Sequence, residues 1–289
     1  MNNNILQRMK SIRQTVQISN AQKLVAAAHI GRARTLLKQS RPYHDKVSRV
    51  IVEVLRHCPG IDSRYIEANL DGASAGKGRG LLVLAASHGL AGGFNSNITH
   101  FAEQSLKDRP AEYIIVLGGA CRARLIQGGY PVDPEYYQPL EPPTMFTARE
   151  LAERVLTVLE WANIGSFDVI YTTYRSAARM ETVQRRLLPL SPTIFEGLGE
   201  DRSNFDFEPS PKHVLESLLI KYLKGYIYGC LTNTYICELT SRVTAMDNAI
   251  RNGNEMLDKL SLAYNRARQS AITQEITEII AGAAALQTE

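Results

Sequence analysis

The sequence predicts an α/β fold. It comprises a parallel sheet with covering helices in the middle of the chain, and an antiparallel coiled coil formed by long helices at the two ends. The first observation is that ten of the twelve prolines fall between positions 110 and 211, since proline disrupts helix interiors. The second is that both ends carry residues at the alternating four-three spacing of a coiled-coil seam. The third is a set of short apolar runs in the middle, which are typical of buried strands.

A long helix is expected over residues 1–57. Its seam comprises Ile5, Met9, Ile12, Val16, Ser19, Lys23, Ala26, Ile30, Ala33 and Leu37. Because proline removes a backbone donor and clashes with the preceding turn, Pro42 is expected to kink or break this helix. A helical pattern resumes after Pro42 and ends at Cys58-Pro59-Gly60, a clear stop signal.

A second long helix is expected over residues 211–289. Ser210 is placed to cap it, and Pro211 occupies the first helical position, where a missing N–H costs nothing. Its seam comprises Leu218, Tyr222, Gly225, Gly229, Thr232, Ile236, Leu239, Val243, Met246, Ile250, Gly253, Leu257, Leu260, Tyr264, Ala267 and Ala271. About 75 helical residues would span roughly 110 Å. A helix of that length must pair with another helix or pass through a partner.

The middle of the chain, residues 58–210, reads as a domain of alternating strands and helices. Apolar runs at 81–87, 113–119 and 167–174 predict strands, and the intervening patterns predict helices over 95–107, 147–162 and 176–187. Thr147 and Glu150 have the spacing of a capping box at the start of the second of these helices. Strands that alternate with helices predict a parallel sheet.

Composition excludes several classes of protein. No apolar run approaches the roughly 18–20 residues of a membrane span, and the N-terminus lacks the apolar core of a signal peptide. We therefore expect a cytosolic chain, with peripheral membrane association left open. The four cysteines form no CxxC pair and the six histidines show no ligand spacing, so neither a metal site nor a cofactor is expected.

Charge is distributed unevenly along the chain. Residues 1–57 carry eleven Lys/Arg against two acids, an excess of nine positive charges in a chain whose net charge is +4. Such a segment favours an acidic partner, which could be nucleic acid, an anionic membrane or an acidic protein surface. The basic residues are not interleaved with aromatic residues, and this favours protein packing over nucleic acid.

The glycine-rich stretch 89–93 follows an apolar run and precedes a helix, as phosphate-binding loops do. Its spacing fits neither GxGxxG nor GxxxxGK[ST], and the segment 72–77 also fails the second pattern. A tight strand-to-helix turn is the expected role of these glycines. No catalytic set stands out, and Asp133, Glu135 and Glu141 are expected to be solvated loop residues.

Several motifs, in order, resemble the gamma subunit family of F-type ATP synthases. They are "QISNAQKLVAAA" (17–28), "SRPY" (40–43), "GLAGGFNSN" (89–97), "RRLLPL" (185–190), "FEPSPKHVLESLL" (207–219), "YNRARQSA" (264–271) and "ITQEITEIIAGAAAL" (272–286). The resemblance covers essentially the whole chain. It implies a Rossmann-like middle domain and a rotor without catalytic residues, on the cytoplasmic face of a bacterial membrane and peripheral to it.

The resemblance also implies partners and contact residues. The partners are three alpha and three beta subunits, the epsilon subunit and the c-ring, with no nucleic acid. Positions that match beta-subunit contacts are Arg268, Gln269, Thr273, Glu275, Arg242, Gln22 and Lys23. Positions that match the foot facing the c-ring and epsilon are Phe207 and Glu208.

The chain departs from the family pattern at 29–31, 86–91 and 237–243, which leaves a divergent or paralogous scaffold protein open. The residues also leave open two unrelated classes of protein. One is a basic coiled-coil protein that binds nucleic acid, and the second is a nucleotide-binding α/β enzyme.

Overall fold

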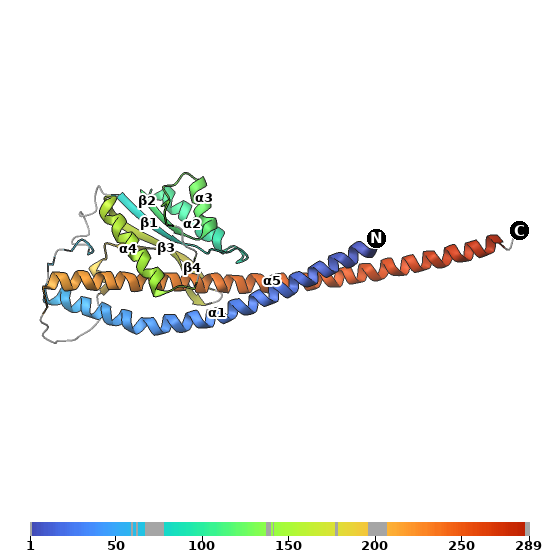
Figure 1. Ribbon diagram of the computed structural model, residues 1–289, viewed down its shortest axis with the longest axis horizontal. Helices are drawn as coiled ribbons and strands as arrows, with labels where there is room; N and C mark the ends of the chain where they lie inside the picture. The colour runs from blue at the N-terminus through green and yellow to red at the C-terminus, as the bar shows by residue number, and fades with distance from the viewer. Residues whose placement is uncertain are drawn as a thin grey trace. The chain divides into compact units, whose positions relative to one another are not determined.

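The computed structural model describes residues 2–58, 60–61, 63–66, 78–136, 140, 142–176, 179–195 and 207–286 (Figure 1). Packing divides the chain into two compact units. Unit 1 comprises residues 1–27 and 242–289, and unit 2 comprises residues 28–241. The domain boundaries expected from the sequence were the ends of the two long helices, which gave residues 1–57, 58–210 and 211–289. That division stays a prediction.

Two long helices run through both units. They are α1 (Asn2–His57) and α5 (Pro211–Leu286). Every predicted seam residue of both helices is buried or half-buried, which confirms the four-three spacing. The predicted start of α5 is also confirmed, because the Ser210 hydroxyl accepts a hydrogen bond from the His213 N–H at 3.3 Å.

Pro42 was expected to kink or break the first helix, and the break is wrong, since α1 continues through this residue. The kink stays a prediction. Proline in a helix interior costs about 3 kcal/mol. Packing on both sides outweighs that cost, because Ala33 precedes Pro42 and Val47 follows it with 3% and 7% of their surface exposed.

A four-stranded sheet forms the centre of unit 2. Its strands are β1 (Gly78–Leu84), β2 (Tyr113–Leu117), β3 (Ile164–Ser176) and β4 (Arg179–Leu188), in the order β2-β1-β3-β4. The first three are parallel, as predicted, whereas β4 pairs antiparallel with β3. The predicted helix over 176–187 is therefore wrong, and this segment is the second arm of a hairpin at the sheet edge.

Three further α-helices cover the sheet: α2 (Phe94–Asp108), α3 (Gly119–Gln127) and α4 (Met145–Trp161), and a short 3-10 helix, η1, spans Pro192–Phe195. Helix α3 has no counterpart in the prediction. Helix α4 is capped by Thr144, whose side chain accepts from the Thr147 N–H. The predicted capping box at Thr147 is thus misplaced by one turn.

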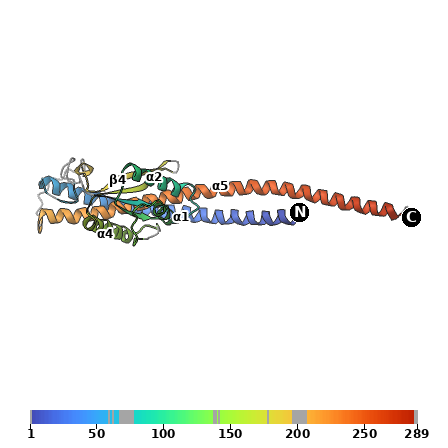
Figure 2. The ribbon, with the colours of Figure 1, turned by 90° about the horizontal axis from the view of Figure 1, so that it is seen from above.

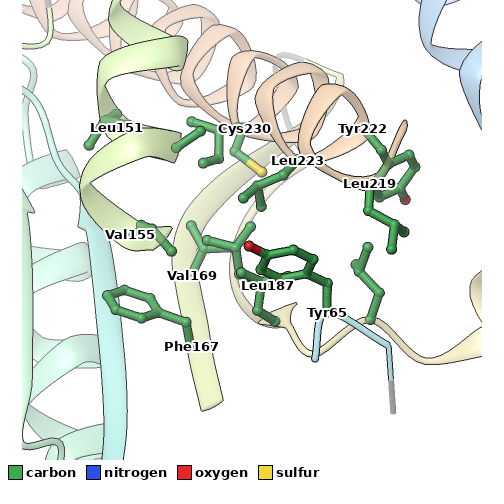
Figure 3. Close-up of a cluster of buried hydrophobic side chains, with 14 of the residues drawn as sticks. Tyr65, Leu151, Val155, Phe167, Val169, Leu187, Leu219, Tyr222, Leu223 and Cys230 are labelled. Carbon is green, nitrogen blue, oxygen red and sulfur yellow. The ribbon is translucent and has the colours of Figure 1, made fainter. Parts of the chain in front are cut away.

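Alternating residues of β1 point into two separate cores. Leu82 and Leu84 join α4 and the unit 2 part of α5 in one core, and Leu81 and Val83 join α2 and α3 in the other. In the first core, shown in Figure 3, α5 contributes Leu219, Tyr222 and Leu223. The terminal helix is therefore part of the domain core, which fixes its orientation within unit 2.

Candidate functional site

Within unit 1, α1 and α5 pack antiparallel. The Lys23 ammonium lies 2.5 Å from an Asp247 carboxylate oxygen, and Val16 lies against Gly253. Residues nearer the N-terminus of α1 therefore contact residues nearer the C-terminus of α5. A side chain added at Gly253 would lie 2.5 Å from a Val16 methyl group, so this glycine gives the two backbones the close approach that its seam position suggested.

Helix α5 continues beyond the start of α1 (Figure 2). One-for-one extension of the pairing places Asn2 level with about residue 267, because both helices rise equally per residue. Residues 272–280 are all exposed, and among them are the isoleucines at 272, 276, 279 and 280, with exposures of 44–71%. This end of the helix, residues 268–280, is called the tip below.

The tip carries four of the predicted contact residues. Arg268, Gln269, Thr273 and Glu275 are all exposed. The Thr273 hydroxyl donates to the Gln269 carbonyl oxygen at 2.9 Å, so it bonds within its own helix. The structure thus presents these residues together on a helix that no α1 residue faces.

The other predicted contacts in unit 1 are less open. Gln22, Lys23 and Arg242 are half-buried. Lys23 is engaged by Asp247, and this hydrogen bond lowers the pKa of the Asp247 carboxyl below its ordinary value. Part of the positive charge of α1 is therefore neutralised within the helix pair.

The predicted foot lies in unit 2, where α1 ends and α5 begins. The half-buried Phe207 ring lies edge-on to the His57 ring, with centroids 6.3 Å apart, and Glu208 is exposed. The structure brings this pair next to the C-terminus of α1, which their sequence positions did not indicate.

The glycine loop is closed by its own side chains. The Asn95 carboxamide oxygen accepts from the Ala86 N–H at 3.0 Å, and its nitrogen donates to the His88 carbonyl oxygen at 3.3 Å. Leu90 and Gly92 have φ values of 65° and 57°, so the turn uses the left-handed conformation. A backbone N–H that a phosphate would need is thus occupied, which supports the prediction of a structural turn. The segment 72–77 lies outside the described residues.

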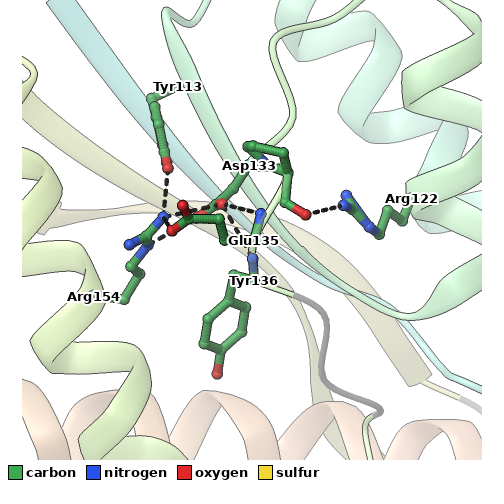
Figure 4. Close-up of polar contacts among 7 residues, drawn as sticks. Tyr113, Arg122, Asp133, Glu135, Tyr136 and Arg154 are labelled. Atoms are coloured by element: carbon green, nitrogen blue, oxygen red, sulfur yellow. Dashed lines mark hydrogen bonds and ion pairs between the residues drawn. The ribbon is translucent and has the colours of Figure 1, made fainter.

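Asp133 was expected to be solvated, and this was wrong. Its side chain is fully buried, and Arg154 of α4 donates to both carboxylate oxygens at 2.9 and 3.1 Å (Figure 4). Burial alone would raise the pKa of Asp133, but hydrogen bonds from Arg154 and from two backbone N–H groups outweigh it and hold the pKa below its ordinary value. Glu135 is exposed as expected, and Glu141 lies outside the described residues.

A second buried network joins three strands. The Asp168 carboxylate of β3 accepts from Arg79 of β1 at 2.9 Å, and from Gln184 and Arg186 of β4 at 2.9 and 2.8 Å. Sequence reasoning missed this cluster, since its members lie far apart in the chain. In both networks each charged side chain lies within hydrogen-bonding distance of an opposite charge.

Three of the four cysteines are buried, and Cys58 is half-buried. Cys230 and Cys237 are buried, and burial raises the pKa of the Cys237 thiol to about 12, so it remains protonated. No group of three or more potential metal ligands occurs in the described ranges. Likewise, within those ranges no helix is long and apolar enough to cross a membrane.

Comparison with known proteins gives consistent matches along the whole chain. A family model described as ATP synthase matches residues 2–286. The "ATP synthase gamma chain" of Acetivibrio thermocellus is 38% identical over 293 residues, covering 99% of both chains, and that of Staphylococcus carnosus is 32% identical, covering 97% of both.

Solved structures agree on the fold. A chain of the central stalk and c-ring structure of the Tetrahymena thermophila mitochondrial ATP synthase superposes with a TM-score of 0.58 at 22% identity, covering 80% of this chain and 99% of its own. A chain of the Euglena gracilis mitochondrial ATP synthase gives a TM-score of 0.59 at 16% identity, covering 90% of this chain and 95% of its own.

Proposed function

The chain belongs to the ATP synthase gamma-chain family, and from this premise we propose how its parts serve the central stalk of an F-type ATP synthase. The rotor stands between the three alpha and three beta subunits on one side and the c-ring with the epsilon subunit on the other. Ion flow turns the c-ring, and the paired helices carry that rotation to the sites where ATP is made or hydrolysed.

The tip is the part of the chain that most needs a surrounding partner. Its isoleucines are 44–71% exposed, and a lone helix of this length is only marginally stable in water. An enclosing sleeve of the alpha and beta subunits would cover these side chains. Arg268, Gln269, Thr273 and Glu275 then meet the catch loops of the beta subunits, with Arg268 and Gln269 as the principal contacts.

Gln22, Lys23 and Arg242 form a second contact region with the lever loops and catch loops of beta. Lys23 already pairs with Asp247, which holds its ammonium group in place. We assign to this ammonium group a second contact, with a carboxylate of the partner subunit. The excess positive charge of residues 1–57 attracts acidic loops and makes the association sensitive to salt.

The foot residues Phe207 and Glu208 face the epsilon subunit and the c-ring. The chain itself has no catalytic residues, because ATP chemistry belongs to the alpha and beta subunits, and it needs no cofactor. It works on the cytoplasmic face of a bacterial membrane as a peripheral protein.

The contact assignment is tested in the assembled enzyme. A variant with Arg268→Ala and Gln269→Ala is co-expressed with the other subunits, and ATP-driven ion pumping is measured beside ATP hydrolysis. We expect pumping per ATP to fall severalfold while far-UV circular dichroism stays unchanged. The matched control is Arg13→Ala with Gln14→Ala, two exposed neighbours of the same types on α1. Equal pumping by both double variants would refute the special role of the tip residues.

Assembly provides the wider test. The full chain should co-purify as one copy per three alpha and three beta subunits. A folded chain that fails to do so, yet binds duplex DNA tightly at low salt, would favour a nucleic-acid-binding protein instead. Heat released on titration with ATP or NAD would favour a nucleotide-binding enzyme.

A further inference from the structure

Helices α1 and α5 also pack against each other in unit 2, and His44 of α1 lies at one of these contacts. Its ring centroid is 4.6 Å from that of Tyr222 on α5, and the two ring planes are tilted by 41°. A side chain added at Gly225 would lie 2.8 Å from the His44 ring, so the ring needs a glycine at this position to rest on the backbone of α5. The imidazole is therefore enclosed between a tyrosine ring and a glycine of the neighbouring helix.

The Nε2 atom of His44 is buried in this contact. Within the described part of the chain it has no hydrogen-bond partner. In a neutral imidazole this nitrogen can be an unprotonated acceptor, and burying such an atom costs little beside burying a charge. In the protonated imidazole both ring nitrogens are donors, and the ring carries a positive charge. The geometry of the contact therefore favours the neutral ring.

The charges on α1 itself do not reverse this preference. Burial lowers the pKa of His44, and the neighbouring Asp45 carboxylate, which raises it, offsets only part of that effect. Asp45 is exposed, and so is Arg41, a cation one turn before His44 on the same helix. The pKa of the His44 imidazole is therefore held below its ordinary value.

On the other elements, the groups near the contact are neutral, positive or already paired. Burial raises the pKa of the Tyr222 hydroxyl to about 12, so this group is neutral near pH 7. The ring of Phe195 in η1 packs edge-on against Tyr222, with centroids 5.2 Å apart. Two lysines flank the contact on α5. Lys221 is exposed, and Lys224 pairs with Glu153 of α4 at 3.2 Å, so this carboxylate is engaged by another cation.

Helix α1 is weakened close to the contact. Pro42, two residues before His44, has no N–H, so one hydrogen bond of the helix is missing there. Along α1, buried residues stop at Ala33 and resume at Val47, and the residues between them are half-buried or exposed. The His44 ring therefore holds a part of α1 that has few other contacts to hold it.

We propose that His44 makes the packing of α1 on α5 in unit 2 sensitive to pH. The neutral ring closes the contact, and protonation of the ring loosens the part of α1 around Pro42. Acidification is then the signal to which the contact responds. The proposal does not depend on the rotor assignment, since it concerns the full chain by itself.

The direction of the effect follows from the two states of the chain. In the unfolded chain His44 has its ordinary pKa near 6.5, and in the folded chain its pKa is lower. The unfolded chain therefore takes up the proton more readily. The stability that the contact contributes is complete above about pH 6.5 and falls as the pH drops toward the folded pKa.

The test follows the stability of the full chain against pH. Urea midpoints are measured from Trp161 fluorescence between about pH 7.5 and 5.5, above the range in which ordinary carboxyl groups titrate. We expect the midpoint of the unaltered chain to fall over this range. His44→Phe keeps a ring against Tyr222 that cannot be protonated, so this variant should lose about half or more of the fall.

The matched control is His100→Phe, which makes the same change at an exposed position of α2 and should leave the fall nearly unchanged. If His44→Phe does not fold, His44→Gln gives the same comparison with a smaller side chain that does not titrate.

Two further measurements locate the effect. In NMR spectra of the chain with isotope-labelled histidine, the His44 ring should titrate at lower pH than the exposed His100 ring. In hydrogen exchange corrected for intrinsic rates, the amides of residues 43–47 should lose protection severalfold on acidification in the unaltered chain and not in His44→Phe.

Three results would overturn the proposal. The first is an equal fall of the urea midpoint in the unaltered chain and in the His44 variant that folds. The second is titration of His44 at or above the pH at which His100 titrates. The third is a loss of protection that is spread evenly along α1, which would assign the pH dependence to other groups.

Discussion

Asp168 offers the sharpest test of the framework of unit 2. The change Asp168→Asn keeps the size of the side chain and removes its charge. The carboxylate is 4% exposed and holds together Arg79, itself 3% exposed, and Arg186 at the edge of the sheet. Asparagine retains one acceptor oxygen, but its amide N–H groups would face an N–H donor of a neighbouring side chain. One of the two hydrogen bonds from charged groups is lost, and the Arg79 charge stays buried without a carboxylate charge to compensate it.

The magnitude follows from these contacts. Removing one partner of a buried pair costs about 3–5 kcal/mol, because the remaining charge is not compensated. With a urea m-value of about 2–3 kcal/mol/M, the unfolding midpoint should fall by about 1–2 M. The assay is urea unfolding followed by far-UV circular dichroism and by the fluorescence of Trp161, the single tryptophan, which lies in unit 2.

The control makes the same substitution where burial is absent. Asp247 is 62% exposed and pairs with Lys23, so Asp247→Asn should shift the urea midpoint much less than Asp168→Asn does. If the two variants shift the midpoint equally, burial does not govern the strength of these pairs, and the assignment of Asp168 as a structural centre fails.

Three further effects are expected. Thr144→Ala removes the cap of α4 and should cost about 1 kcal/mol in urea unfolding. The pKa of Asp133 is lowered in the folded protein, so the carboxylate stabilises the fold at pH values above its unfolded pKa near 4. This stabilisation is lost as the pH falls through the folded pKa. Asp133→Asn should therefore make the free energy of unfolding depend less on pH when it is measured from about pH 5 to 2. Gly229→Ala should raise the free energy of unfolding by about 0.5–1 kcal/mol, because there is open space around the new methyl group. Gly253→Ala should not, because its methyl group would lie 2.5 Å from Val16. Thermal melts of the two variants would check this difference.

The periodic features of the chain could be predicted from the sequence, because they depend on local spacing. Every seam residue assigned to the two long helices is buried or half-buried, and the start of α5 at Pro211 follows from a local cap. The three apolar runs became the three parallel strands. In each case the signal lies within a few residues of the element that it predicts.

Features that depend on pairing across the chain could not be predicted. The segment 179–188 carries Met180, Val183 and Leu187 at helical spacing, yet it forms β4 because β3 offers it a complete antiparallel edge. The burial of Asp168 requires Arg79, 89 positions away, and the strand register that brings the two together. Charged residues are ordinarily exposed, so a single sequence gives no reason to place either of them inside.

The two units are stabilised very differently, and this difference bears on how the helix pair works. Unit 2 contains two extended cores, whereas the buried residues found in the described part of unit 1 are Met9, Ser19, Ala26 and Met246. Four buried side chains, two of them small, remove little apolar surface from water, and each contributes at most about 1.5–3 kcal/mol. Because conformational entropy opposes this gain at every ordered residue, the helix pair of unit 1 cannot draw much rigidity from its own seam. A shaft that transmits rotation must be stiff, so the stiffness of unit 1 would have to come in large part from the subunits that we propose enclose it.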